Sequence, residues 1–176
     1  MNWSYTIPDG EHAGVTLWSN RYCGITAIVL LEKDDEVFIL ANKRGKGCED
    51  LPAIWNLPSG FLDEEENGKQ GASRETYEEC GVLIPPELFD IYEVVTEPER
   101  CHKGHVTIRY GVLIDDSNRN LIDFSKFDEI GTTGGEKDEV EKRKWIPIEE
   151  YKNYQWAFGH DKLIEELLIH MGADIQ

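Results

Sequence analysis

The sequence has few basic residues for its size. Of its 176 residues, 18 are Lys or Arg and 35 are Asp or Glu, which gives a formal net charge of −17. Proteins that bind nucleic acids or anionic membranes generally need a basic patch, so the composition argues against both kinds of partner. A substrate carrying phosphate groups would also be repelled. Bound metal or local Lys and Arg would have to reverse the sign of the charge at its binding site.

Long apolar runs are also missing. No run approaches the ~20 residues that a membrane-spanning helix needs. The first 14 residues have neither the basic region nor the apolar stretch of a signal peptide. We therefore expect a cytoplasmic location. Hydrophobic residues still make up 40% of the chain, which favours a single domain over residues 1–176 with its core elements at about 23–170.

Cysteines are few and scattered. Cys23, Cys48, Cys80 and Cys101 show no CxxC spacing, so we expect reduced thiols. The segment 101–105 combines a cysteine with two histidines but lacks a second ligand pair, which argues against structural zinc.

Apolar patterns predict strands before and after a mid-chain helix, and a second helix at the end. This order predicts an α/β fold with a mixed β-sheet covered on both faces. A long surface loop is expected at 115–135. The predicted elements are a hairpin of strands at 23–31 and 36–41, a short helix at 74–81, strands at 88–95, 105–114 and 144–148, and a helix at 160–171.

The most informative segment is 60–82, GFLDEEENGKQGASRETYEECGV. On a helix at ~100° per residue, Glu75, Glu78 and Glu79 lie within about 100° of one another. Three crowded carboxylates destabilise a helix unless a cation lies among them, and Mg²⁺ prefers oxygen ligands of this kind. A solvated acidic face is the alternative explanation on so acidic a protein.

Neighbouring residues favour a built site over a solvated face. Arg74 lies one turn before Glu78 and can pair with it or with Glu66, which would fix a carboxylate rotamer. A stripe of small residues beside the glutamates suits a helix packed closely on a sheet. These residues are Ala72, Thr76 and Cys80.

Segment 60–82 resembles the Nudix box, whose pattern is Gly, five residues, Glu, seven residues, then Arg-Glu-apolar-x-Glu-Glu-x-Gly-apolar. The one departure is Thr76 at the first apolar position. The resemblance extends over roughly 23–170 through the order of elements, and it implies an α/β/α sandwich with a loop–helix–loop catalytic motif. The matching residues are Gly60, Glu66, Arg74, Glu75, Glu78, Glu79, Gly81 and Val82.

The resemblance implies Mg²⁺- or Mn²⁺-dependent hydrolysis of a phosphoanhydride bond in a nucleoside diphosphate linked to another group. The metal ligands that it implies are Glu75, Glu78, Glu79 and the backbone carbonyl of Gly60, with Glu66 and Arg74 orienting them.

The general base differs among Nudix enzymes. In some it is a glutamate of the box, here Glu75 or Glu79, and in others an acidic residue of a later loop. The loop that ends at Trp145 offers Glu136, Asp138, Glu139 and Glu141. Glu139 and Glu141 are preferred because they directly precede the strand containing Trp145.

The expected partner is a small nucleotide-derived substrate, with ADP-ribose or a related molecule favoured. Relatives that cleave ADP-ribose often carry a proline 15–16 residues past the box, and Pro98 lies 16 residues beyond Val82. A proline there equally marks a turn.

Candidates for local positive charge are Lys43, Arg44 and Lys46. Candidates for stacking on a base are Trp55, Tyr22, Tyr110 and Trp145, although buried aromatics are commoner.

Other functions stay open. A nucleoside triphosphate pyrophosphohydrolase would use the same box. A non-catalytic nucleotide sensor with a Nudix fold would need a damaged box or an attached DNA-binding segment, and neither is expected here. An isopentenyl diphosphate isomerase would need a catalytic cysteine with extra histidine ligands, and Cys48 and the histidines form no convincing arrangement. Many relatives form homodimers, but nothing in the sequence marks an interface.

Overall fold

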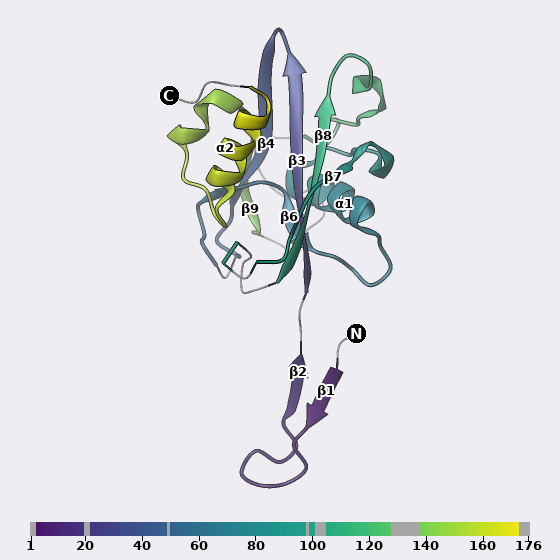
Figure 1. The fold of residues 1–176 in the computed structure, drawn as a ribbon, viewed down its shortest axis with the longest axis vertical. Helices are drawn as coiled ribbons and strands as arrows, with labels where there is room; N and C mark the ends of the chain where they lie inside the picture. Colours follow the sequence, from purple (N-terminus) through teal and green to yellow (C-terminus); the bar gives the residue numbers. More distant parts are fainter. Residues whose placement is uncertain are drawn as a thin grey trace.

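The computed structural model describes residues 3–19, 22–48, 50–97, 99–100, 105–127 and 138–172. Its centre is a seven-stranded mixed sheet with the strand order β5-β4-β3-β8-β7, in which β6 also pairs with β3 and β9 with β4 (Figure 1). The strands are β3 (Cys23–Lys33), β4 (Glu36–Arg44), β5 (Trp55–Asn56), β6 (Ser59–Phe61), β7 (Asp90–Val95), β8 (Val106–Ile114) and β9 (Val140–Pro147).

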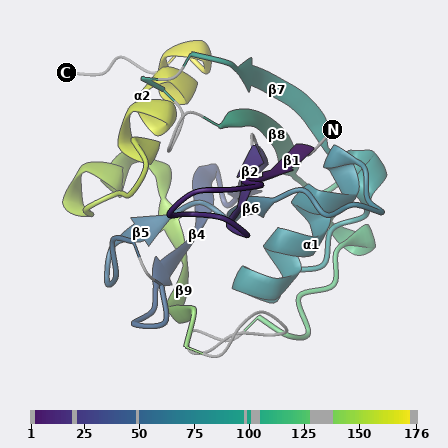
Figure 2. The ribbon, with the colours of Figure 1, turned by 90° about the horizontal axis from the view of Figure 1, so that it is seen from below.

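Two helices cover opposite faces of this sheet. The helix α1 (Gly68–Cys80) packs Ala72 and Cys80 on one face. The helix α2 (His160–His170) packs its leucines and Ile164 on the other, and Figure 2 shows the two helices apart from each other across the strands. Because both faces are covered, β3 is buried continuously from Ile25 to Leu31. The predicted α/β fold with a mixed, doubly covered sheet is confirmed.

The sheet divides at one end, and this division positions the site. The strands β3 and β4 pair with each other only from Leu30 to Lys33 on β3. At the start of β3, residues 24–26 pair with β6, whereas the end of β4 pairs with β5 and β9. The strand β6 therefore carries residues 59–61 to the side of α1.

Several element boundaries differ from the predicted ones. The predicted short helix at 74–81 begins earlier, at Gly68, where Asn67 caps it, and it ends at Gly81 as expected. The strand predicted at 88–95 begins at Asp90, because a 3₁₀ helix occupies Pro86–Leu88. The loop predicted at 115–135 contains a 3₁₀ helix at Arg119–Leu121, and its residues 128–137 lie outside the described part.

A separate hairpin of β1 (Trp3–Thr6) and β2 (Thr16–Ser19) extends away from the sheet (Figure 1). The sequence pattern did not predict it. A further 3₁₀ helix, Ile148–Asn153, leads from β9 toward α2. Within the described ranges, none of the helices has the length and apolar character required to cross a membrane.

Candidate active site

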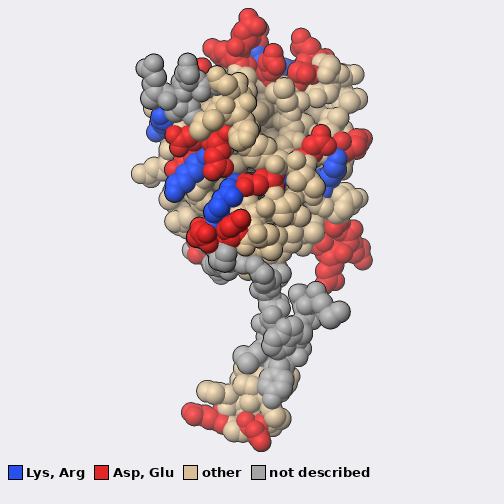
Figure 3. All heavy atoms as spheres, viewed as in Figure 1, with Lys and Arg blue, Asp and Glu red and all other residues tan. Residues whose placement is uncertain are grey.

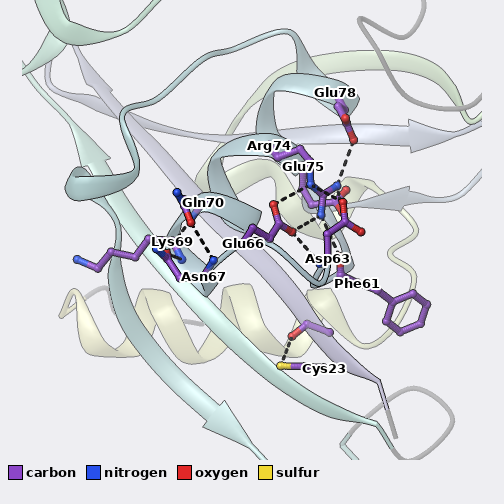
Figure 4. Close-up of polar contacts among 11 residues, drawn as sticks. Cys23, Phe61, Asp63, Glu66, Asn67, Lys69, Gln70, Arg74, Glu75 and Glu78 are labelled. Atoms are coloured by element: carbon purple, nitrogen blue, oxygen red, sulfur yellow. Dashed lines mark hydrogen bonds and ion pairs between the residues drawn. The ribbon is translucent and has the colours of Figure 1, made fainter. Parts of the chain in front are cut away.

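Arg74 of α1 binds three glutamates, Glu66, Glu75 and Glu78 (Figure 4). Its guanidinium binds both oxygens of Glu66, at 3.0 Å from Nε and 2.6 Å from Nη2. Its Nη1 donates to Glu75 Oε1 at 2.7 Å and to Glu78 Oε2 at 3.2 Å. Hydrogen bonds from Arg74 hold the pKa of Glu66 below its usual value. Both predicted partners of Arg74, Glu66 and Glu78, are therefore confirmed as contacts.

Glu79 lies behind this cluster and is 5% exposed. Its Oε2 accepts hydrogen bonds from Asn42 Nδ2 at 2.7 Å and from the Ser59 amide at 2.9 Å. The Glu79 backbone carbonyl accepts from Arg143 Nε at 2.8 Å. Burial, with the nearby Glu75 charge, raises the pKa of Glu79 well above its usual value. Two strands, β4 and β6, thus fix the Glu79 carboxylate, and β9 holds its backbone at the C-terminal end of α1.

Glu75 faces Gly60 of β6. Burial raises the pKa of Glu75 to about 7, although the Arg74 charge acts in the opposite direction. A β-carbon at Gly60 would overlap the Glu75 carboxylate, so only glycine lets the β6 backbone come this close to α1. Buried carboxylates with raised pKa values favour a cation in their midst.

Gly60, Arg74, Glu75 and Glu78 line one part of a cleft of about 760 Å³. Gly24, Ile25 and Thr26 of β3 line it, together with Ser59, Gly60 and Phe61 of β6. Four arginines reach it although the chain is strongly acidic: Arg44, Arg74, Arg100 and Arg109. Acidic residues line the same cleft, so the arginines place local positive charge among carboxylates rather than making the cleft basic. These acidic residues are Asp50, Asp63, Glu75, Glu78 and Glu139.

Arg44, the last residue of β4, also lines the cleft. Its Nε and Nη2 donate to the Asp50 carbonyl at 3.1 and 3.0 Å, and its guanidinium lies 4.9 Å from the Phe158 ring centre. Phe158 has a φ of 57°, a strained value for a bulky residue. These hydrogen bonds go to a neutral carbonyl, which does not neutralise the charge of the Arg44 guanidinium.

The other two arginines share a carboxylate on β7. Arg109 Nη1 donates to Glu93 Oε2 at 2.6 Å. Arg100 donates to both Glu93 oxygens, at 2.7 and 3.1 Å. The sequence pattern missed this pair, because only the register of β7 on β8 brings Glu93 opposite Arg109.

The structure separates the two preferred loop glutamates. Glu139 lines the cleft, and its charge contributes to raising the pKa of Glu75. Glu141 lies on β9, where it pairs with Lys43 at 3.0 Å, and it is not among the described residues that line the cleft. Asp138 is exposed, and Glu136 lies outside the described residues.

The other predicted candidates are similarly divided. Of the three basic residues at 43–46, Arg44 lines the cleft, whereas Lys43 pairs with Glu141 and Lys46 is exposed. Tyr110 is buried in the core, and Trp55 and Trp145 pack against core clusters. Tyr22 is 41% exposed and contacts the cleft residues Phe61 and His105. Pro98 and residues 101–104 lie outside the described part.

Three further cleft or supporting residues had no sequence signal. Phe61 follows the box glycine, Asn42 ends a buried stretch of β4, and His160 opens α2. His160 is 4% exposed and its Nδ1 accepts the Leu57 amide at 3.0 Å. Burial, with the charges of Arg109 and Arg44, lowers the pKa of His160 to about 3, so this imidazole is neutral at physiological pH.

The chemistry of the oxygen ligands at this site suits a divalent cation. Glu75, Glu78 and Glu79 offer hard oxygen ligands, and the close approach of Gly60 to Glu75 brings a backbone carbonyl into the same region. Among the described residues, no three His, Cys, Asp or Glu side chains are gathered closely enough to hold a metal. Arg74 explains this spacing, because its Nη1 stands between Glu75 and Glu78.

Comparison with known proteins gives a consistent result. Residues 23–167 match the family model described as the NUDIX domain. The chain is 30% identical over 136 residues to Nudix hydrolase 6 of Arabidopsis thaliana, covering 76% of this chain and 41% of that protein. It is 24% identical over 141 residues to an ADP-ribose pyrophosphatase of Methanocaldococcus jannaschii, covering 79% of this chain and 69% of that protein.

Among solved structures, the NUDIX domain of Shewanella oneidensis NrtR complexed with ADP ribose has a similar fold. The TM-score is 0.66 at 22% identity, covering 87% of this chain and 90% of that one. NrtR is also similar in its complex with a 27mer DNA, with a TM-score of 0.62 over 85% of this chain and 61% of that one. The present chain spans less than half the length of the Arabidopsis relative.

Proposed function

The chain belongs to the Nudix family, and from this premise we propose that it hydrolyses a phosphoanhydride bond in a nucleoside diphosphate linked to another group. The observation that carries the proposal is the intact box in its folded setting. Glu66, Arg74, Glu75 and Glu78 form one bonded cluster, and this cluster opens onto a cleft with further arginines.

Glu75, Glu78 and Glu79, with the Gly60 carbonyl, would hold Mg²⁺ or Mn²⁺. A bound divalent cation supplies charge neutralisation for the diphosphate and activation of water. Arg74 and Glu66 orient Glu75 and Glu78 through the hydrogen bonds described above, and Asn42 and the Ser59 amide fix Glu79. A helix holds three ligands at spacings that a mobile loop could not maintain.

We assign the role of general base to Glu139. It faces the cleft, whereas the Glu141 carboxylate pairs with Lys43. Glu139 accepts a proton from water as the water oxygen attacks phosphorus, and the bridging oxygen leaves with its bonding electron pair. Glu75 and Glu79 are the alternative bases. Their hydrogen bonds with Arg74, Asn42 and Ser59 favour a ligand role for both.

ADP-ribose is the favoured substrate. The archaeal relative is an ADP-ribose pyrophosphatase, and the similar NrtR domain was solved with ADP ribose. The Arg44 guanidinium, which is held by the neutral Asp50 carbonyl, suits a phosphate of this dianion. Hydrolysis of ADP-ribose at its diphosphate would release AMP and ribose 5-phosphate.

The second candidate is a nucleotide sensor, which the similarity to a DNA-complexed NrtR structure brings forward. The intact set of Glu75, Glu78 and Glu79 favours the enzyme. Tight ADP-ribose binding without turnover would favour the sensor.

A substrate panel tests the proposal. It should contain ADP-ribose, nucleotide sugars, dinucleotides and nucleoside triphosphates, each with Mg²⁺ or Mn²⁺. We expect metal-dependent release of AMP and ribose 5-phosphate from ADP-ribose. Reaction in ¹⁸O-water identifies the attacked phosphorus by the labelled product. Failure to cleave any member of the panel would contradict the proposal.

A further inference from the structure

An exposed aromatic cluster lies at the rim of the cleft. Its ring centres are 4.9 Å apart for Tyr22 and Phe61, 5.3 Å for Phe61 and His105, and 5.5 Å for Tyr22 and His105. The Tyr22 amide donates to His105 Nδ1 at 3.3 Å, which ties the residues before β3 and β8 together. Phe61 is 47% exposed and Tyr22 is 41% exposed. Such exposed apolar groupings commonly mark binding surfaces.

The strand register places a flat floor beside Phe61. Gly24 of β3 pairs with Phe61 of β6 on one side and with Thr107 of β8 on the other. Directly paired residues project to the same face of a sheet, and all three line the cleft. Gly24 has no side chain, and a β-carbon there would lie 3.2 Å from Thr107 Oγ1. The three residues form a slot. The Phe61 ring lies on one side, the Thr107 hydroxyl on the other, and the Gly24 backbone between them.

The next row of the same face is polar. Thr26 pairs with Ser59 and with Arg109, and these three residues also line the cleft. A ligand that lies along the strands would therefore meet an aromatic slot first and then a cationic, hydroxyl-rich row. This order matches a nucleotide, in which an apolar planar base is joined to a charged phosphate.

We propose that Phe61, Gly24 and Thr107 form the nucleobase subsite of this protein, with the base stacked on the Phe61 ring. The inference rests on the proposed nucleotide substrate, and it specifies which end of the cleft receives the base. Elsewhere in the cleft, Phe158 faces the Arg44 guanidinium at 4.9 Å, an arrangement that suits a phosphate or sugar. Stacking explains why Phe61, next to Gly60 on β6, is left half in solvent.

Calorimetric titration with two ligands isolates the base. AMP and ribose 5-phosphate both carry a phosphate monoester, but only AMP carries a base. For Phe61→Leu we expect the Kd of AMP to rise about tenfold, since the variant removes the aromatic ring on which the base stacks. The Kd of ribose 5-phosphate should stay within about twofold. Gly24→Val, which fills the floor of the slot, should weaken AMP selectively as well.

Phe124→Leu is the matched control, because Phe124 packs on the core and does not line the cleft among the described residues. It should leave both Kd values unchanged. Unchanged AMP binding in Phe61→Leu, or equal weakening of both ligands, would overturn the proposal. Selective loss of AMP binding in Phe158→Leu alone would also overturn the proposal, because it would place the base at Phe158. Binding is measured without turnover. If the wild-type protein is inactive but Phe61→Leu still weakens AMP binding selectively, the proposed hydrolysis is refuted and the subsite is supported.

Discussion

Glu139 and Glu141 lie close in sequence but have different surroundings. Glu139 faces the cleft, and Glu141 is bound to Lys43 at 3.0 Å. The sequence pattern could not choose between them. The β4–β9 pairing shifts register between Lys43 and Arg44, and this irregularity decides which carboxylate turns toward the cleft. An irregularity of this kind depends on tertiary pairing and leaves no local sequence signal.

For the general base we therefore predict a clear contrast. Glu139→Gln should lower kcat about 100-fold or more, since positioned general bases contribute about 10²–10⁴-fold. The matched variant Glu141→Gln should stay within about twofold, since it removes only a partly exposed ion pair. Steady-state kinetics with the preferred substrate measure both. Equal effects of the two substitutions would contradict the assignment.

His160 makes stability depend on pH. Its pKa is about 3 in the folded protein and about 6.5 when unfolded, so between these values the unfolded chain binds the extra proton. Stability is therefore lost as pH falls from about 6.5, by up to about 1.4 kcal/mol per pH unit. His160→Asn keeps an acceptor for the Leu57 amide and does not titrate.

Chemical denaturation of both proteins at several pH values tests this expectation. Relative to His160→Asn, the wild type should lose about 2 kcal/mol between pH 6.5 and pH 5. Parallel pH profiles of the two proteins would show that His160 does not titrate as described.

At the scale of elements, α1 shows what the sequence could predict. Its C-terminal half and the stop at Gly81 were correctly predicted from the box. Its first two turns were missed because glycines at 68 and 71 have low helix propensity. These glycines have a packing reason: a β-carbon at Gly68 would overlap the Tyr110 hydroxyl, and one at Gly71 would lie 3.0 Å from Glu66 Oε1. Close packing overrides propensity here.

The N-terminal cap of α1 offsets the low helix propensity of these glycines. Asn67 accepts the amides of Lys69 and Gln70, and Gln70 Oε1 accepts the Asn67 amide at 2.9 Å. Asn67→Ala should therefore destabilise the protein by about 1 kcal/mol. Lys69→Ala, which removes only the exposed pair with Asp90, should cost less than about 0.5 kcal/mol. Urea unfolding measures both, and equal midpoints for Asn67→Ala and wild type would rule out a stabilising cap.

At the scale of the whole molecule, charge distribution matters more than net charge. Acidic side chains are spread over the face in Figure 3, and the formal net charge is −17. The cleft nevertheless collects four arginines. Composition predicted that local positive charge was required, and of the candidates Lys43, Arg44 and Lys46 it is Arg44 that lines the cleft. Arg74 was predicted only to orient the glutamates. Arg100 and Arg109 could not be predicted, because their position depends on how β7, β8 and β3 align.

The glutamates of α1 are proposed to support metal-dependent hydrolysis in this cleft. The most direct test is to titrate the initial rate on the preferred substrate with Mg²⁺, for wild type, Glu78→Gln and the control Glu87→Gln, which changes an exposed glutamate in a 3₁₀ helix. We predict that wild type and Glu87→Gln require Mg²⁺ equally, and that Glu78→Gln loses at least about 100-fold in kcat/KM. Unchanged Mg²⁺-dependent rates in Glu78→Gln would contradict the claim.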